Sequence, residues 1–248
     1  MYNDNGLKGD KWSKIAYPGE IVYPDGVDFN TGYWIMNYFN YIGNGVFSNK
    51  IGRVINSNLK NSKEIDFKVE LNRVRQVVSK IEKREDDIIK YWSGKSIVEI
   101  IMCMSLKLLV KYESSEGMKV RIISILTKAI NDSYIIATYY KYFYDIPRPI
   151  QLDEKINCRI DTPKSPSYPS VYLATMATAI EILVYYFPKE RKKLLMIQQQ
   201  LGESRLYGGI HFRKDLYDGV KLGKQIGKEI ILQVSKELDV KGRVIDKF

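Results

Sequence analysis

The chain has 248 residues, which is enough for one large domain with a sizeable hydrophobic core. Hydrophobic residues account for 45% and charged residues for 27% of the sequence, an ordinary balance for a globular protein that excludes extensive disorder. The formal net charge is +10, but lysines are interspersed with glutamates and there is no arginine-rich arm or zinc-finger spacing, so nucleic-acid binding is not expected.

Residues that bind metals or form disulfides are few. Cys103 and Cys158 fit neither a zinc spacing nor a disulfide framework and are expected to be reduced thiols in a cytoplasmic protein. His211 is the only histidine, so a histidine-rich metal site is excluded and no metal is expected. The first twelve residues contain two aspartates and no apolar run, unlike a secretory signal. The longest apolar stretch, 171–187, is shorter than the roughly 20 residues of a membrane-spanning helix, so no transmembrane segment is expected.

Residues 1–60 form an aromatic, loop-rich N-terminal arm. Turn sequences interrupt it at 18–19, 24–26 and 43–45, each with glycine close to proline or asparagine. One short amphipathic helix is predicted around four apolar side chains, Trp34, Ile35, Tyr38 and Phe39. The arm is expected to pack across the rest of the protein. Most of its aromatic side chains are expected in the core rather than around an apolar pocket, among them Tyr23, Trp34, Tyr38 and Tyr41.

From residue 62 onward the pattern becomes helical. Apolar residues at 74, 77, 78 and 81 predict an amphipathic helix that ends near Trp92. Further helices are predicted at 96–112, 118–144, 170–187, 189–201 and 203–238. Five prolines between Pro147 and Pro169 hold the intervening chain extended, and no alternation of apolar and polar residues is long enough to predict a sheet. The expected fold class is all-α, a bundle of about six core helices, in a single domain 1–248 whose helical core is 62–248.

Two motifs place polar groups next to helix ends. In K-Y-F-Y-D-I-P-R-P, residues 141–149, Lys141 and Arg148 are seven residues apart, so both cations can lie on one helical face, although such a pair is usually solvated. In S-Y-P-S-V-Y, residues 167–172, Ser170 directly precedes an apolar helix, where serine is a favoured N-cap. A helix N-terminus also presents free backbone N–H groups to an anion.

A third motif, S-R-L-Y-G-G-I-H-F-R-K-D, occupies residues 204–215. His211 and Asp215 are four residues apart, so on a helix the carboxylate can accept a hydrogen bond from one ring nitrogen and fix the tautomer. The other ring nitrogen is then free to act as a nucleophile. Gly208 and Gly209 allow a close backbone approach just before the histidine. Taken alone, a pair with this spacing is more often structural.

In chain order the three motifs resemble the signature of the type 2 phosphatidic acid phosphatase / vanadium haloperoxidase superfamily. That signature reads Lys, six residues, Arg-Pro; then Pro-Ser-Gly-His; then Ser-Arg, five residues, His, three residues, Asp. The runs A-I-N-D-S-Y-I-I-A-T-Y-Y-K-Y-F-Y-D-I-P-R-P, T-P-K-S-P-S-Y-P-S and G-G-I-H-F-R-K-D-L-Y-D-G-V-K-L-G are similar to the soluble haloperoxidase-like branch. The resemblance covers about 129–226 and does not extend to residues 1–60. It implies the helical fold of this superfamily.

The resemblance also implies an oxyanion pocket within residues 141–215. Lys141, Arg148 and Arg205 would hold the equatorial oxygens of phosphate or vanadate. Ser170 and the backbone N–H of Val171 would add hydrogen bonds. Three cations and a helix N-terminus are suited to stabilise the charge of a phosphoryl-transfer transition state.

For the reaction itself, the resemblance implies that His211 attacks phosphorus to give a phosphohistidine, or ligates vanadium in a haloperoxidase, while Asp215 orients it. The sequence departs from the pattern in the second motif, where Val171 and Tyr172 stand in place of Gly-His. In the superfamily that histidine protonates the leaving group. A tyrosine is poorly matched to shuttle a proton at neutral pH, so Tyr172 is either a substitute acid or a core residue. Loss of a general acid typically costs about 10²- to 10⁴-fold when the leaving group is poor.

Three readings follow. The first is a phosphatase-like enzyme that acts on a phosphorylated small molecule with a good leaving group, such as an isoprenoid diphosphate, without a cofactor; a lyase or cyclase that expels diphosphate is its variant. The second is a haloperoxidase with vanadate as cofactor, against which the missing histidine counts. The third is a phosphate-binding protein without catalysis. By analogy with soluble relatives, a homodimer is expected.

Overall fold

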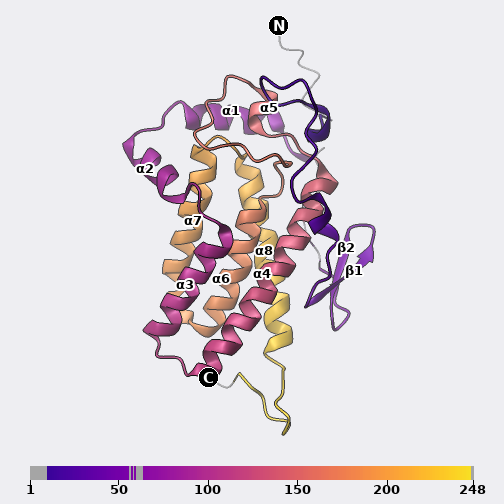
Figure 1. The fold of residues 1–248 in the computed structure, drawn as a ribbon, viewed down its shortest axis with the longest axis vertical. Helices are drawn as coiled ribbons and strands as arrows, with labels where there is room; N and C mark the ends of the chain where they lie inside the picture. Colours follow the sequence, from indigo (N-terminus) through magenta and orange to yellow (C-terminus); the bar gives the residue numbers. More distant parts are fainter. Residues whose placement is uncertain (1–9, 56, 58, 60–63, 247–248) are drawn as a thin grey trace.

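The computed structural model describes residues 10–55, 57, 59 and 64–246. Within these residues, five long helices run roughly along the long axis and form a bundle (Figure 1): α3 Ile97–Lys111, α4 Glu116–Tyr144, α6 Val171–Tyr186, α7 Arg191–Tyr207 and α8 Arg213–Val234. Helix α6 packs against α8, α4, α7 and α3 and is buried along almost its whole length. The prediction of an all-α helical bundle is confirmed.

Shorter helices lie around one end of the bundle, together with the segment 145–170 (Figure 1): α1 Phe67–Val78, α2 Lys83–Trp92 and α5 Pro149–Leu152. The single helix predicted to end near Trp92 is two helices, because the chain turns after Val78 and Glu82 is extended before α2. The predicted break near residue 202 is also misplaced. Helix α7 continues through Gly202 and ends at Tyr207, and Gly209 then adopts a left-handed φ of +75°, which glycine tolerates without strain.

The N-terminal arm packs across the bundle as predicted; residues 1–9, 56, 58 and 60 of it lie outside the described part of the chain. Its elements are two 3-10 helices and an antiparallel hairpin: η1 Trp12–Lys14, η2 Phe29–Tyr33, β1 Phe39–Gly43 and β2 Val46–Asn49. Helix η2 packs against α4, and Gly32 lies so close to it that a Cβ would sit 2.9 Å from the Cα of Tyr139. The arm therefore covers part of the surface of α4.

The helix predicted around Trp34 to Phe39 is not formed. The Asp132 carboxylate on α4 accepts hydrogen bonds from the backbone N–H groups of Asn37 (2.9 Å) and Tyr38 (2.6 Å), which fixes the bend in the chain just before β1. The hairpin is a small sheet that residue alternation did not predict. The prediction of core packing holds for Tyr38 alone among the four aromatic residues, because the other three are between 46% and 59% exposed: Tyr23, Trp34 and Tyr41.

Helices α6 and α8 approach each other closely along glycines of α8. Gly219 and Gly223 are one helical turn apart and face α6. A Cβ on Gly219 would lie 2.6 Å from the Ser170 carbonyl oxygen, and one on Gly223 would lie 2.0 Å from that of Ala174. The Ser170 N–H also donates a hydrogen bond of 3.0 Å to the Asp215 carbonyl. The glycines thus bring together the N-terminal ends of two helices that carry two of the three motifs.

The apolar stretch 171–187 forms the buried helix α6, as predicted for a core helix. Among the helices of the described residues, none is both long and apolar enough to cross a membrane. Cys103 is exposed, Cys158 is half-buried, and both are free thiols.

Candidate active site

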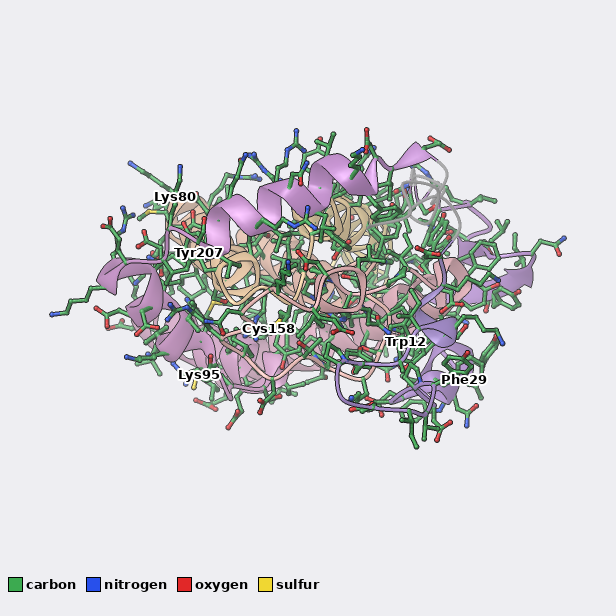
Figure 2. All side chains as sticks on the ribbon, turned by 90° about the horizontal axis from the view of Figure 1, so that it is seen from above. Trp12, Phe29, Lys80, Lys95, Cys158 and Tyr207 are labelled. Carbon is green, nitrogen blue, oxygen red and sulfur yellow. The ribbon has the colours of Figure 1, made fainter. Side chains whose placement is uncertain are left out.

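The three motifs meet at the end of the bundle covered by the segment 145–170. A cavity of about 390 Å³ lies there, and the N-terminal arm adds Val27 and Asp28 to its lining. Six of the predicted site residues line this cavity: Lys141, Arg148, Val171, Tyr172, Arg205 and His211. Figure 2 looks onto this end of the molecule: Cys158, on the covering segment, lies near the middle of the view.

His211 and Asp215 form the expected contact. Oδ2 of Asp215 lies 2.9 Å from Nδ1 of His211 and also accepts hydrogen bonds from the backbone N–H of Phe212 (2.9 Å) and from the Ser167 hydroxyl. His211 is not on the helix, as the sequence suggested, but in the turn before α8, whereas Asp215 is in the first turn of α8. The carboxylate therefore fixes both the ring of His211 and the start of the helix.

The imidazole of His211 is neutral in this environment. Burial lowers its pKa well below the usual value, and the nearby Arg148, Lys141 and Arg205 cations lower it further. Because Asp215 accepts from Nδ1, the proton of the neutral ring belongs on Nδ1. Nη1 of Arg148 lies 3.0 Å from Nε2, where it can donate to the free lone pair. Nε2 is thus an unprotonated nitrogen beside the cavity.

Lys141 and Arg148 are both buried, at 5% and 1% exposure, whereas a pair with this spacing is usually solvated. They do not share a helical face, because α4 ends at Tyr144 and Arg148 lies beyond it, just before α5. Nζ of Lys141 donates to the backbone carbonyls of Pro166 (2.6 Å) and Ser167 (3.2 Å).

The Arg148 guanidinium forms hydrogen bonds to two loop segments that border the cavity, one at Ser165 and one at Ile210. It donates to the carbonyls of Ser165 (2.8 Å) and Ile210 (2.9 Å), and Nη2 donates to the Ser165 hydroxyl at 3.2 Å. All of these acceptors are uncharged. The sequence could not have predicted the two carbonyl acceptors, because backbone carbonyls carry no sequence signature.

Arg205, in the last turn of α7, completes the group of cations. Its Nη2 donates to the Trp92 carbonyl at 2.8 Å, and its guanidinium lies 5.0 Å from the centre of the Tyr172 ring. Its Nε is buried and has no hydrogen-bond partner among the described residues. A buried donor without a partner is costly unless a ligand satisfies it.

The basic groups of the site outnumber its buried acidic groups. Lys141, Arg148 and Arg205 are buried together with one buried carboxylate, Asp215, and burial lowers the pKa of all three bases. Burial raises the pKa of Asp215 to about 6, against the opposing effect of its hydrogen bonds and of the cations. The other carboxylates in the lining, Asp28 and Asp161, are exposed. An oxyanion would supply the missing negative charge and an acceptor for the free Arg205 donor.

Comparisons with known proteins place this arrangement in a familiar fold. Residues 191–239 match the family described as the VCPO second helical-bundle domain. The structure is similar to a bacterial vanadium-dependent iodoperoxidase, with a TM-score of 0.63 and 18% identity over 92% of this chain and 60% of that one. It is also similar to a bacterial vanadium-dependent chloroperoxidase, with a TM-score of 0.69 and 12% identity over 91% of this chain and 60% of that one.

Phosphatases with the same architecture are similar as well. LpxE from Aquifex aeolicus aligns with a TM-score of 0.53 and 20% identity over 67% of this chain and 97% of that one. A transmembrane PAP2-type phosphatidylglycerolphosphate phosphatase from Bacillus subtilis aligns with a TM-score of 0.51 and 15% identity over 70% of this chain and 88% of that one. The chain has the fold of the phosphatidic acid phosphatase / vanadium haloperoxidase superfamily. The resemblance inferred from the motifs is confirmed at this level.

The similarity has two limits. The chain spans 60% of the length of the two haloperoxidases, and its identity to all four structures is 20% or less. No curated protein matches the sequence.

Of the three predicted site residues in the second motif, Val171 and Tyr172 line the cavity and Ser170 does not. Ser170 is the N-cap of α6, where its hydroxyl accepts from the Leu173 N–H at 3.4 Å. The hydroxyl of Tyr172 donates to the Lys95 carbonyl at 3.2 Å.

Ser167 and Asp28 are among the residues of the site that the sequence interpretation missed. Ser167 belongs to the second motif and its position was noted, but its hydrogen bond to Asp215 requires the fold to bring residues 48 apart into contact. Asp28 lines the cavity from the N-terminal arm and accepts from the Tyr134 hydroxyl at 3.2 Å. The superfamily motifs contain no signal for the arm.

Proposed function

We propose that the chain is a phosphatase-like enzyme that hydrolyses a phosphate or diphosphate ester with a good leaving group. One observation carries the proposal: Nε2 of His211, the nitrogen without a proton, shares one cavity with three buried basic side chains, Lys141, Arg148 and Arg205. The cations are held by neutral acceptors, so their charge is available to an oxyanion. The superfamily fold, which includes phosphatases, supports the same reading.

The reaction takes two steps. Nε2 of His211 attacks phosphorus, a P–N bond forms, and the bond from phosphorus to the leaving-group oxygen breaks with its electron pair on that oxygen. Water then attacks the phosphohistidine, a P–O bond forms, and the P–N bond breaks with its electron pair on Nε2. The proton lost by the water stays with the inorganic phosphate as it leaves. Asp215 holds the Nδ1 proton throughout and stabilises the positive charge that the ring acquires in the first step.

The leaving group is limited by what the chain lacks. No second histidine exists in the sequence to protonate it. Phosphate, an enolate or a resonance-stabilised anion departs without a proton, whereas an alkoxide does not. An isoprenoid diphosphate meets this condition, because attack on its terminal phosphorus breaks the anhydride bond and the leaving group is the isoprenyl monophosphate. A lyase or cyclase that expels the whole diphosphate would use the same cations without a phosphohistidine.

The test is phosphate release from a series of aryl phosphates, alkyl phosphates and diphosphates. We expect turnover to rise steeply with the acidity of the leaving group. Replacement of His211 by Asn should abolish phosphate release, and Arg205→Ala should lower kcat/KM by about 10²- to 10³-fold. Lys221→Ala, an exposed lysine of α8, is the matched control and should behave like the wild type.

Each alternative has its own outcome in the same assay. Release of diphosphate together with an alkene or cyclic product, retained in His211→Asn, would indicate a lyase. Phosphate that binds to the wild type but is never released from any substrate would indicate a binding protein and contradict the hydrolase proposal.

A vanadate-dependent haloperoxidase is the second candidate. The observation that favours it is the higher TM-score of the two haloperoxidases, 0.63 and 0.69 over more than nine tenths of the chain. Lys141, Arg148, Arg205 and His211 would hold vanadate, because the basic side chains of the site suit vanadate as well as phosphate. When bound, vanadate supplies the activation of peroxide for halide oxidation. Halogenation of an organic dye with vanadate, bromide and peroxide, absent in His211→Asn, would support this candidate over the first.

A further inference from the structure

Arg205 is oriented by groups that the proposed reaction leaves without a role. The Arg205 guanidinium lies 5.0 Å from the centre of the Tyr172 ring, and Nη2 donates to the Trp92 carbonyl at 2.8 Å. Arg205 is only 8% exposed, and no carboxylate in the described part of the chain forms an ion pair with it. A ring face and a carbonyl oxygen, both uncharged, therefore hold this cation.

The Tyr172 ring is itself fixed at two points. Its backbone is in the first turn of α6, and its hydroxyl donates to the Lys95 carbonyl at 3.2 Å. Lys95 lines a separate groove between α3 and α7 and does not line the cavity of the site. The phenolic proton is thus directed at a backbone oxygen outside the oxyanion pocket.

Both acceptor carbonyls, those of Trp92 and Lys95, belong to one short turn. Trp92 ends α2 and is buried, and the Ser93 hydroxyl donates to the Ile89 carbonyl at 2.7 Å, which anchors the turn to α2. Gly94 has a left-handed φ of +71°, which lets the chain reverse within these few residues. The turn 92–95 therefore holds Arg205 through one carbonyl and Tyr172 through another.

We propose that Tyr172 is a positioning residue for Arg205 and not the acid that protonates the leaving group. The ring face attracts the guanidinium and occupies one side of its plane, so that the unpartnered Nε is left for an oxyanion. This proposal rests on the proposed oxyanion role of the cavity. It explains why an aromatic residue suits a position where the superfamily pattern has histidine: the acid is lost and a support for Arg205 is gained.

The test compares Tyr172→Phe, which keeps the ring, with Tyr172→Leu, which removes it. The affinity for inorganic phosphate is measured by calorimetry. We expect the Leu variant to bind phosphate about 2- to 30-fold more weakly and the Phe variant to retain most of the affinity. Tyr217→Leu is the matched control, because that ring also lies near a cation, Lys214, at 5.4 Å but is 66% exposed and outside the cavity.

Two further readouts separate positioning from a general effect on folding. In an Arg205→Ala background, Tyr172→Leu should cause no additional loss of affinity, because it acts through Arg205. Turnover of aryl phosphates by Tyr172→Phe should change by the same factor for every leaving group. Two results would overturn the proposal: wild-type phosphate affinity in Tyr172→Leu, or a loss in Tyr172→Phe of about 10²-fold or more that grows as the leaving group becomes poorer.

A measurement without ligand keeps the proposal independent of the proposed function. The Nε–Hε resonance of Arg205 should carry a ring-current shift that is retained in Tyr172→Phe and lost in Tyr172→Leu. If the wild type binds no phosphate, the proposed function fails, while this resonance still decides whether Tyr172 orients Arg205. An identical Arg205 resonance in all three proteins would show that the ring does not contact it.

Discussion

Binding of phosphate to the cavity is expected to draw protons from the solvent. Burial and the charge of Arg148 lower the pKa of Lys141 well below its ordinary value, and burial with the three cations does the same for His211. A dianion beside these groups favours their protonated forms. At an effective dielectric constant of about 20, two unit charges about 4 Å apart attract by about 4 kcal/mol. Protonating a group costs about 1.4 kcal/mol for each pH unit above its pKa, so this attraction can overcome about three pH units.

Isothermal titration calorimetry measures this uptake. Titrations of phosphate at a pH of about 8.5, in buffers with different ionisation enthalpies, give observed enthalpies whose slope is the number of protons bound. We expect a slope of about 0.5 to 1 proton per phosphate, and an affinity that falls as the pH rises. In Lys141→Arg the slope should fall, because arginine stays charged without ligand. The slope measured with His211→Asn shows how much of the proton uptake is due to the histidine.

A slope of zero in the wild type, with phosphate bound, would refute this reasoning. It would mean that Lys141 is already protonated in the ligand-free protein and that burial among neutral carbonyls does not suppress its charge. The same slope in wild type and Lys141→Arg would assign the uptake to another group.

Three more predictions concern the stability of the fold. Phosphate about 100-fold above its Kd should raise Tm by about 5–10 °C in calorimetry, and Arg205→Ala should lose most of this shift; a shift that persists would place phosphate elsewhere. The pKa of Lys141 is lowered in the folded state, so the unfolded chain binds more protons than the folded protein below a pH of about 10.5. The free energy of unfolding of the wild type, relative to Lys141→Met, should therefore rise with pH toward about 10.5, by up to about 1.4 kcal/mol per pH unit. Urea unfolding at several pH values checks the sign. Gly223→Ala should lower the free energy of unfolding by about 1–3 kcal/mol, because its Cβ would lie 2.0 Å from the Ala174 carbonyl oxygen. Gly117→Ala has open space around its Cβ and should leave the free energy of unfolding unchanged or raise it slightly by the same measurement.

The helical core could be predicted because its helices are long and bounded by strong signals. Helix α4 was expected at 118–144 and is Glu116–Tyr144, with Ser115 as N-cap and Pro147 following its end. The boundary between α7 and α8 was placed wrongly because Gly202 resembles a helix end in the sequence. In the fold that glycine lies against α6, where a Cβ would be 3.6 Å from the Leu173 side chain. Local patterns do not distinguish a glycine that ends a helix from one that allows close packing.

The arm could not be predicted from local patterns, since its conformation is imposed from a distance. Asp132, 95 residues after Asn37, binds the backbone N–H groups that a helix would have used. A buried aspartate on an apolar helix is visible in the sequence, but its partner is not. Hydrogen bonds to backbone atoms depend on where the chain lies and carry no residue-type signal.

The candidate site shows the same division between side chains and backbone. Spacing alone paired His211 with Asp215, and the pair is in contact although the helix on which that argument relied begins only after His211. The argument succeeded because a turn that leads into a helix also brings residues four apart together. By contrast, the helical-face argument did not describe how Arg148 joins Lys141: Lys141 is on α4, whereas Arg148 follows the end of that helix at Asp145, whose φ is +53°.

Three glycines of α8 place the motifs against one another, and their regular spacing is visible in the sequence. Gly219, Gly223 and Gly227 recur every fourth residue of α8 and face α6, which lets the two helices approach closely. A side chain at Gly219 would push against the Ser170 carbonyl, and hence against the start of α6, where Tyr172 supports Arg205. The geometry of Arg205 thus depends on residues that have no side chain and do not line the cavity. For this reason we expect substitutions in the glycine stripe to weaken phosphate binding even where the helices still form.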